Sequence, residues 1–165
     1  MRSFGYVGPA EIRARAVEGN GGTPADSQEA VLTWLRDNFT PDAGWATFVV
    51  DLSGTLLVAP RRTEHVACAA GNRVLAAGEL RFARDGAVAE ITNNSTGYCP
   101  AEDCWPAVDA ALKRAGLVGP SSFTFVARFR RCPRCLERNL IKDDWYYCAF
   151  CDSALPLAWN FDERI

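Results

Sequence analysis

The first half of the chain contains one helical pattern followed by a series of short apolar runs. Thr23 and Pro24 are a typical helix start, and the apolar residues after them recur at three- and four-residue spacing, which predicts an amphipathic helix over roughly 24 to 38. From residue 45 onward, apolar runs separated by turn-forming residues predict strands at 47–50, 55–59, 65–69, 73–77, 79–82 and 87–92. This succession is typical of an antiparallel meander.

A second helix follows the meander. Pro106 opens a helical pattern that runs to residue 115, and Gly116 stands where a left-handed C-cap is expected. Residues 119–122 combine Gly, Pro and Ser and are the best candidate for a linker. We therefore predict an α+β fold with two domains. In residues 1–120 an antiparallel sheet is flanked by two helices, and residues 121–165 form a separate C-terminal domain.

The C-terminal segment carries two cysteine pairs with metal-binding spacing. Cys132 and Cys135 form the first Cys-x2-Cys pair, Cys148 and Cys151 form the second, and the twelve residues between the pairs are enough for a hairpin. Two such pairs predict four thiolates around one Zn²⁺, and residues 123–160 resemble the broad zinc-ribbon class. Four protein ligands saturate the metal, so we expect one structural zinc. The alternatives are iron with the same ligands, redox dithiols or buried free thiols.

A basic stretch runs through the same segment and is followed by the aromatic residues 145–147. Basic side chains beside stackable rings are typical of single-stranded nucleic-acid binding, which makes candidates of Arg128, Arg130, Arg131, Arg134 and Lys142. The alternative is a solvated strand face with rings that cover a thin core. The whole chain has a net charge of -2 and a pI near 5.4, so any attraction to nucleic acid has to be local.

The remaining cysteines and the single histidine allow three interpretations. His65, Cys68, Cys99 and Cys104 are a candidate second metal set, although their spacing is not that of paired knuckles. Cys99 or Cys104 could instead serve as a thiol nucleophile with His65 and Asn93. The third interpretation is structural, with a hydrogen-bonded histidine and with thiols that pack as small apolar side chains.

An ordered series of motifs spans residues 65–117. It consists of His65, Ala76-Ala77-Gly78-Glu79, Ile91, Asn93, Ser95, Tyr98, Pro100 and the helix at 106–115. The series resembles a module found toward the C-termini of many bacterial polymorphic-toxin and effector proteins, in which Ala-Ala-Gly-Glu forms a turn before a hairpin. The histidine of the motif falls at Gly97 here. The resemblance implies a common fold and a candidate polar cluster made of His65, Glu79, Asn93, Ser95 and Tyr98.

That polar cluster allows either acid–base chemistry or a purely structural role. Its carboxylate, imidazole, amide and hydroxyl groups suit binding of a small polar ligand or catalysis. They would equally suit hydrogen bonds that tie the loop at 93–100 to the sheet. We expect the structural role, since the chain lacks the histidine of the motif.

The chain shows no membrane-spanning or export signal. It contains no run of the roughly 18 apolar residues that a span requires, and its N-terminus lacks the apolar core of a signal peptide. We expect a cytoplasmic protein with no membrane partner. The favoured function is a zinc-binding recognition module of a bacterial protein, with a protein partner. The alternatives are a bacterial-conflict-type enzyme or effector that uses the polar cluster, and single-stranded nucleic-acid binding.

Overall fold

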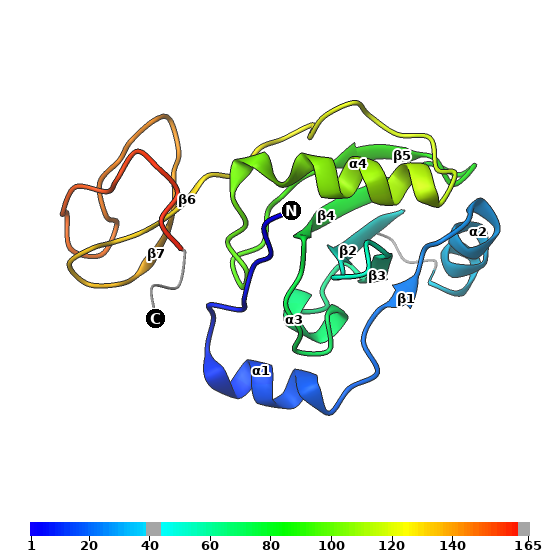
Figure 1. The fold of residues 1–165 in the computed structure, drawn as a ribbon, viewed down its shortest axis with the longest axis horizontal. Helices are drawn as coiled ribbons and strands as arrows, with labels where there is room; N and C mark the ends of the chain where they lie inside the picture. The colour runs from blue at the N-terminus through cyan, green and yellow to red at the C-terminus, as the bar shows by residue number, and fades with distance from the viewer. Residues whose placement is uncertain (39–43, 162–165) are drawn as a thin grey trace. The chain divides into compact units, whose positions relative to one another are not determined.

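The chain forms two compact units, Met1–Val126 and Ala127–Ile165 (Figure 1). The structure is a computed structural model that describes residues 1–38 and 44–161. The first unit combines helices with an antiparallel sheet, which confirms the predicted α+β class. The second unit carries the four ribbon cysteines.

The sheet of the first unit has five strands in the order β1-β3-β2-β4-β5. Its strands are β1 (Thr23–Pro24), β2 (Trp45–Val50), β3 (Leu56–Pro60), β4 (Ala76–Phe82) and β5 (Val88–Ile91). The central strand β2 pairs antiparallel with both β3 and β4, so that Phe48 lies between Val58 and Gly78. Five consecutive residues of β2, from Ala46 to Val50, are buried. Because neighbouring side chains of a strand point to opposite faces, both faces of the sheet are covered at β2.

The helices differ from the prediction at several points. They are α1 (Ala10–Val17), α2 (Gln28–Asp37), α3 (His65–Cys68) and α4 (Trp105–Arg114), with a short 3-10 turn η1 (Glu102–Cys104). The prediction that a helix starts at residue 24 is wrong, because Thr23 and Pro24 pair with β3 as β1. The helix α2 starts four residues later, where the Ser27 side chain accepts a hydrogen bond from the Ala30 N–H at 3.1 Å. The helix α1 was not predicted.

Three predicted strands also differ from the structure. The apolar run at 65–69 is the one-turn helix α3, in which the Glu64 carbonyl accepts hydrogen bonds from Ala67 and Cys68 at 3.0 Å. A short apolar run has no periodicity that would separate a strand from a buried helical turn. The runs predicted at 73–77 and 79–82 lie mostly in the single strand β4, which contains Gly78. The Ala-Ala-Gly-Glu sequence is therefore strand here and not a turn.

The helix α4 contacts β2, β3 and β4, and buries Ala107, Val108, Ala111 and Leu112. Gly116 follows the helix with a φ of 67°, which confirms the predicted left-handed C-cap. The chain then runs beside β5. The Val88 N–H donates to the Val118 carbonyl at 2.8 Å, and the Thr124 N–H donates to the Ile91 carbonyl at 2.9 Å. The segment expected as a linker, residues 119–122, lies between these two attachments.

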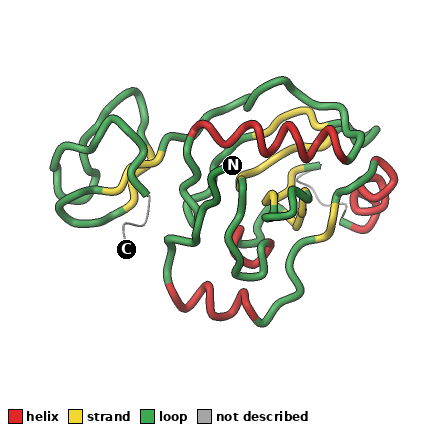
Figure 2. The backbone as a smooth tube through the Cα atoms, in the orientation of Figure 1, coloured by secondary structure: helices red, strands yellow, loops and turns green. Residues whose placement is uncertain are grey.

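The second unit consists mainly of loops (Figure 2). Its two strands, β6 (Phe129–Arg131) and β7 (Arg138–Leu140), form an antiparallel pair. Cys132, Cys148 and Leu155 form a small buried cluster in this unit, and partly buried apolar residues pack around it. A unit of this size buries too little apolar surface to be stable through its core alone. None of the helices in the described residues has the length and apolar character needed to cross a membrane.

Candidate metal centre

The four ribbon cysteines converge on one point. Their sulfur atoms all lie within 4.8 Å of one another, and the Sγ atoms of Cys132 and Cys151, like those of Cys135 and Cys148, are 3.5 Å apart. Sulfurs placed tetrahedrally about 2.3 Å from a zinc ion lie about 3.8 Å from each other. The cluster therefore has the size that a single metal ion with four thiolate ligands requires. Cys132 and Cys148 are buried, while Cys135 and Cys151 are partly exposed.

The two knuckles repeat one backbone pattern. The residue after the second cysteine of each pair has a left-handed conformation, with a φ of 65° at Leu136 and 59° at Asp152. Its N–H donates to the carbonyl of the first cysteine, Cys132 or Cys148, at 3.0 Å in both knuckles. The N–H of that first cysteine donates to the carbonyl five residues later, at 2.9 Å in the first knuckle and 2.8 Å in the second. The two cysteine pairs are thus held in equivalent tight turns.

Hydrogen-bond donors surround the sulfur atoms. Cys148 Sγ accepts from the Phe150 N–H at 3.4 Å and from Asn139 Nδ2 at 3.5 Å. Burial opposes ionisation of Cys148, but hydrogen bonds from these two donors, from the Cys151 backbone and with the Cys135 side chain outweigh it and lower the pKa of this thiol to about 6. The pKa of Cys151 is also lowered, chiefly by Ser153, whose Oγ lies 3.3 Å from Cys151 Sγ. Donors of this kind stabilise the thiolate form that binds metals.

The pKa of the Cys135 thiol is shifted in the opposite direction. At Cys135 a backbone hydrogen bond at Glu137 favours the thiolate, but burial and the neighbouring sulfurs oppose it, and the pKa rises to about 12. A divalent cation at the centre of the cluster favours the thiolate form. The donor set, its size and its charge therefore all fit a metal ion such as Zn²⁺.

Asn139 and Ser153 were not predicted as part of this centre. Asn139 is on β7, is only 5% exposed, and contacts the second knuckle. The sequence does contain a signal for Asn139. Asparagine is uncommon in strands, so an asparagine in a predicted hairpin indicates that its side chain forms a specific hydrogen bond. Ser153 lies two residues beyond Cys151 and has no comparable signal.

Arg130, one of the nucleic-acid candidates, lies inside the second unit. Its side chain is 4% exposed, and its guanidinium donates to the carbonyls of Phe129, Pro156 and Leu157 at 2.6 to 3.2 Å. It also lies 5.8 Å from the centre of the Tyr146 ring. These hydrogen bonds hold the segment after the second knuckle against β6.

The other basic candidates are nearer the surface. Arg128 forms an exposed ion pair with Asp144 at 2.6 Å. Arg131 packs over the Phe161 ring at 5.2 Å and is partly buried. Arg134 and Lys142 are exposed. The five residues thus do not form one continuous basic surface.

The polar cluster predicted in the first unit is largely enclosed. Asn93, Ser95 and Tyr98 are buried, and the Tyr98 hydroxyl donates to the Asn72 carbonyl at 2.6 Å. His65 Nε2 lies 2.9 Å from the Gly78 carbonyl oxygen, and burial lowers the pKa of this histidine in spite of that contact. A carbonyl only accepts hydrogen bonds, so Nε2 is the protonated nitrogen.

Glu79 lies in a different environment. Its carboxylate is 3.8 Å from Arg61, whose guanidinium packs over the Trp45 ring at 4.6 Å.

The other end of the cluster is closed by the N-terminal segment. A Cβ atom at Gly97 would lie 2.8 Å from Tyr6 Cε2, so the Tyr6 ring fills the space beside the position where the resembled motif has histidine.

The second metal set is not assembled. Among the residues that the structure describes, only the four ribbon cysteines form a group of three or more ligands at metal-binding distance. Cys68 Sγ instead lies 3.6 Å from the Leu57 carbonyl oxygen. Burial raises the pKa of Cys68 and of Cys104 to about 12, so both thiols are protonated near neutral pH. Cys99 is buried and its N–H donates to the Ser95 carbonyl at 2.7 Å.

Replacing Tyr98 with phenylalanine is expected to lower the free energy of unfolding of the first unit by about 1 to 2 kcal/mol, because the Asn72 carbonyl loses its donor. Urea denaturation monitored on the first unit measures this change. The control is Tyr147→Phe at an exposed ring, where we expect a change within about 0.5 kcal/mol. Equal stability of the two variants would contradict a structural role for the Tyr98 hydroxyl.

No family model, curated protein or solved structure matches this chain. The resemblance of residues 65–117 to a bacterial toxin module therefore has no support from a family match. What the structure defines is an α+β protein whose C-terminal unit brings four cysteines to metal-binding distance.

Proposed function

We propose that residues 127–161 form a zinc ribbon with one structural zinc ion, and that this ribbon is a recognition module for a protein partner. The observation that carries the metal assignment is the group of four sulfur atoms within 4.8 Å, held in two equivalent turns. Four protein ligands leave no position for water or substrate, so the metal stabilises the fold and takes no part in catalysis.

Elemental analysis of the purified chain tests the metal assignment. We expect one zinc per chain and no iron, because zinc has no redox chemistry and suits a closed structural site. An iron content of one per chain, with the visible absorption of iron bound to thiolates, would show that the site binds iron and not zinc. Protein purified without any metal and unable to take up Zn²⁺ would overturn the proposal.

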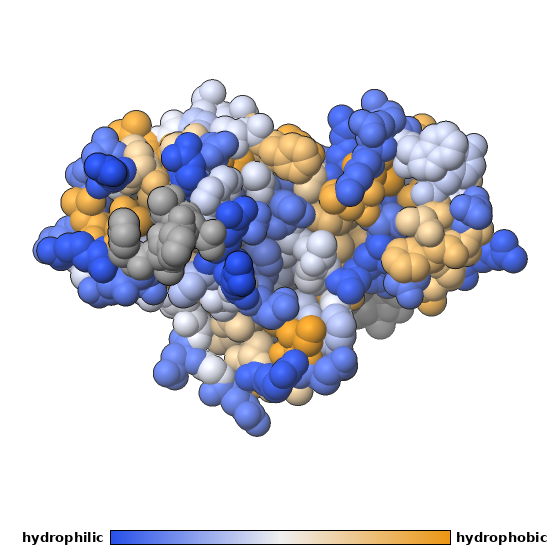
Figure 3. All heavy atoms as spheres, turned by 180° about the vertical axis from the view of Figure 1, so that it is seen from behind, coloured by the Kyte–Doolittle hydropathy of each residue, from blue (hydrophilic) through white to orange (hydrophobic). Residues whose placement is uncertain are grey.

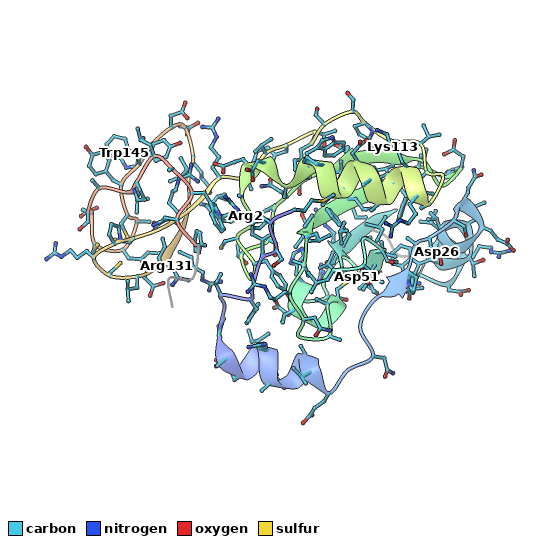
Figure 4. The ribbon with its side chains drawn as sticks, viewed as in Figure 1. Arg2, Asp26, Asp51, Lys113, Arg131 and Trp145 are labelled. Carbon is cyan, nitrogen blue, oxygen red and sulfur yellow. The ribbon has the colours of Figure 1, made fainter. Side chains whose placement is uncertain are left out.

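Exposed aromatic side chains support the recognition role. Trp145 and Tyr147 are 67% and 49% exposed, and their ring centres are 4.9 Å apart. They are two residues apart in the sequence, and Tyr147 forms an isolated β-bridge with Ala154. Figure 4 shows Trp145 at the outer edge of the unit, and Figure 3 shows apolar surface on this unit. Further exposed apolar residues of the unit are Leu136, Phe150 and Leu157.

The charge of the unit favours a protein over a nucleic acid. Residues 127–161 contain six basic and four acidic side chains, which leaves a formal charge of +2. Four thiolates around one Zn²⁺ contribute -2, so the loaded ribbon is neutral. Nucleic-acid binding depends on a concentrated positive surface, whereas exposed aromatic and aliphatic side chains mark contacts with proteins.

Replacing both Trp145 and Tyr147 with alanine is expected to abolish binding of the protein partner while the ribbon stays folded and metal-loaded. Proteins cross-linked to the wild-type chain in cells should be missing from the double variant and present with Leu52→Ala, a control that removes an exposed apolar side chain of the first unit. Fluorescence anisotropy with single-stranded oligonucleotides at low salt provides the opposing test. Tight binding that weakens steeply with salt and is lost in Arg134→Ala/Lys142→Ala would overturn the choice of a protein partner.

A further inference from the structure

Asn139 connects the hairpin of the second unit to its second knuckle. It lies at the centre of β7 and faces Arg130 of β6, the strand that leads into the first knuckle. Its amide is buried and uses both ends. Nδ2 donates to the Glu137 carbonyl at 3.1 Å and to Cys148 Sγ at 3.5 Å, while Oδ1 accepts from the Ala149 N–H at 2.9 Å. One side chain therefore contacts both a ligand sulfur and the backbone beside that ligand.

The neighbours of the amide determine which way it points. The Ala149 N–H only donates, so it requires the amide oxygen opposite it, at 2.9 Å. The NH₂ group must then face the Glu137 carbonyl and the Cys148 sulfur, both of which are acceptors. The flipped amide would place its oxygen against a thiolate and a carbonyl and its NH₂ against an N–H, leaving every contact repulsive. The orientation that donates to the sulfur is thus the one that satisfies all of these partners.

We propose that Asn139 is a positioning residue of the metal centre, which donates a hydrogen bond to the Cys148 sulfur and holds this ligand at a fixed place relative to the first knuckle. This inference rests on the proposed metal-binding function of the ribbon. Groups that orient metal ligands commonly change metal affinity 10- to 100-fold when they are mutated. Without the Asn139 amide, Cys148 loses a donor to its sulfur and the N–H of Ala149 loses its acceptor.

Asn139→Asp is the most selective variant. Aspartate has the same shape and can still accept from the Ala149 N–H, but it presents a carboxylate oxygen to the Cys148 sulfur in place of an N–H. Asn139→Gln retains an amide donor on a longer side chain, so it tests whether an amide donor restores the metal-binding properties that Asn139→Asp loses. The matched control is Asn160→Ala. Asn160 also uses both ends of its amide, but on the backbone of Arg131, with hydrogen bonds of 2.8 Å to its N–H and its carbonyl.

The experiment is a titration of the full chain with Co²⁺ and then with Zn²⁺ in competition with a chromophoric chelator. For Asn139→Asp we expect a 10- to 100-fold loss of Zn²⁺ affinity and a shifted thiolate-to-cobalt charge-transfer band. We expect Asn139→Gln to recover the wild-type cobalt spectrum and Asn160→Ala to keep both affinity and spectrum. Wild-type affinity and spectrum in Asn139→Asp, or equal losses in Asn139→Asp and Asn139→Gln, would overturn the inference. Failure of the wild-type chain to bind either metal would instead overturn the proposed function.

Discussion

Replacing Cys148 with serine is expected to release the metal and unfold residues 127–161. Cys148 is buried in one small cluster with Cys132 and Leu155. Metal binding contributes about 10 to 16 kcal/mol to the folding of structural zinc sites, which is more than a core of this size can replace. The expected change is confined to the second unit because all four clustered cysteines lie there.

Elemental analysis combined with hydrogen exchange measures both parts of this prediction. The variant should contain no bound zinc, and the backbone amides of β6 and β7 should lose their protection. The control is Cys104→Ser, which alters a buried thiol of the first unit and should leave the metal content unchanged. A Cys148→Ser chain that still holds one zinc per molecule, with protected amides in β7, would show that Cys148 is not an essential ligand.

The features predicted from the sequence were those with a repeating or spaced signal. The Cys-x2-Cys pairs require a fixed local turn, so their spacing was enough to predict that Cys132, Cys135, Cys148 and Cys151 converge. The α4 helix was recognised for a similar reason, since four of its apolar residues share one buried face. The α1 helix has no such face. Ala16 is its one buried residue, so its sequence contains almost no amphipathic pattern.

Single polar residues could not be placed from the sequence. Arg130 and Arg128 look equivalent in a basic stretch, yet one is enclosed by backbone carbonyls and the other is exposed beside Asp144. Which of the two is buried depends on where residues 156 and 157 return after the second knuckle, and no local pattern encodes that path. The same is true of Asn139, whose partners lie up to ten residues away in the sequence.

The first unit shows the same limit at Gly78. In the sequence this glycine resembles part of a turn, whereas in the structure it lies inside β4, where the chain leaving β5 passes directly over it. The Thr92 N–H donates to the Glu79 carbonyl at 2.9 Å, so the crossing segment continues along β4 beyond the end of β5. The close approach of two backbone segments depends on residues that are distant in the sequence. The glycine within the strand is the one local indication of it.

Replacing Gly78 with alanine is expected to lower the free energy of unfolding of the first unit by about 3 kcal/mol. A Cβ atom at this position would lie 1.9 Å from the Thr92 carbonyl oxygen and 3.0 Å from the Asn93 Cα, and both of these are backbone atoms. Moving them would break the hydrogen bond between Thr92 and Glu79. It would also shift the Gly78 carbonyl, which accepts from His65 Nε2 at 2.9 Å.

Gly116→Ala separates this steric effect from the general cost of losing a glycine. A Cβ atom at Gly116 would meet nothing within 4 Å, but the φ of 67° is unfavourable for alanine and costs about 1 kcal/mol. Urea denaturation of the two variants, monitored on the first unit, should therefore rank Gly78→Ala as clearly the less stable. Equal or smaller destabilisation by Gly78→Ala would mean that β4 and the segment after β5 can separate at little cost. In that case, the positions of His65, Asn93 and Tyr98 would not depend on the close contact between Gly78 and the backbone of Thr92 and Asn93.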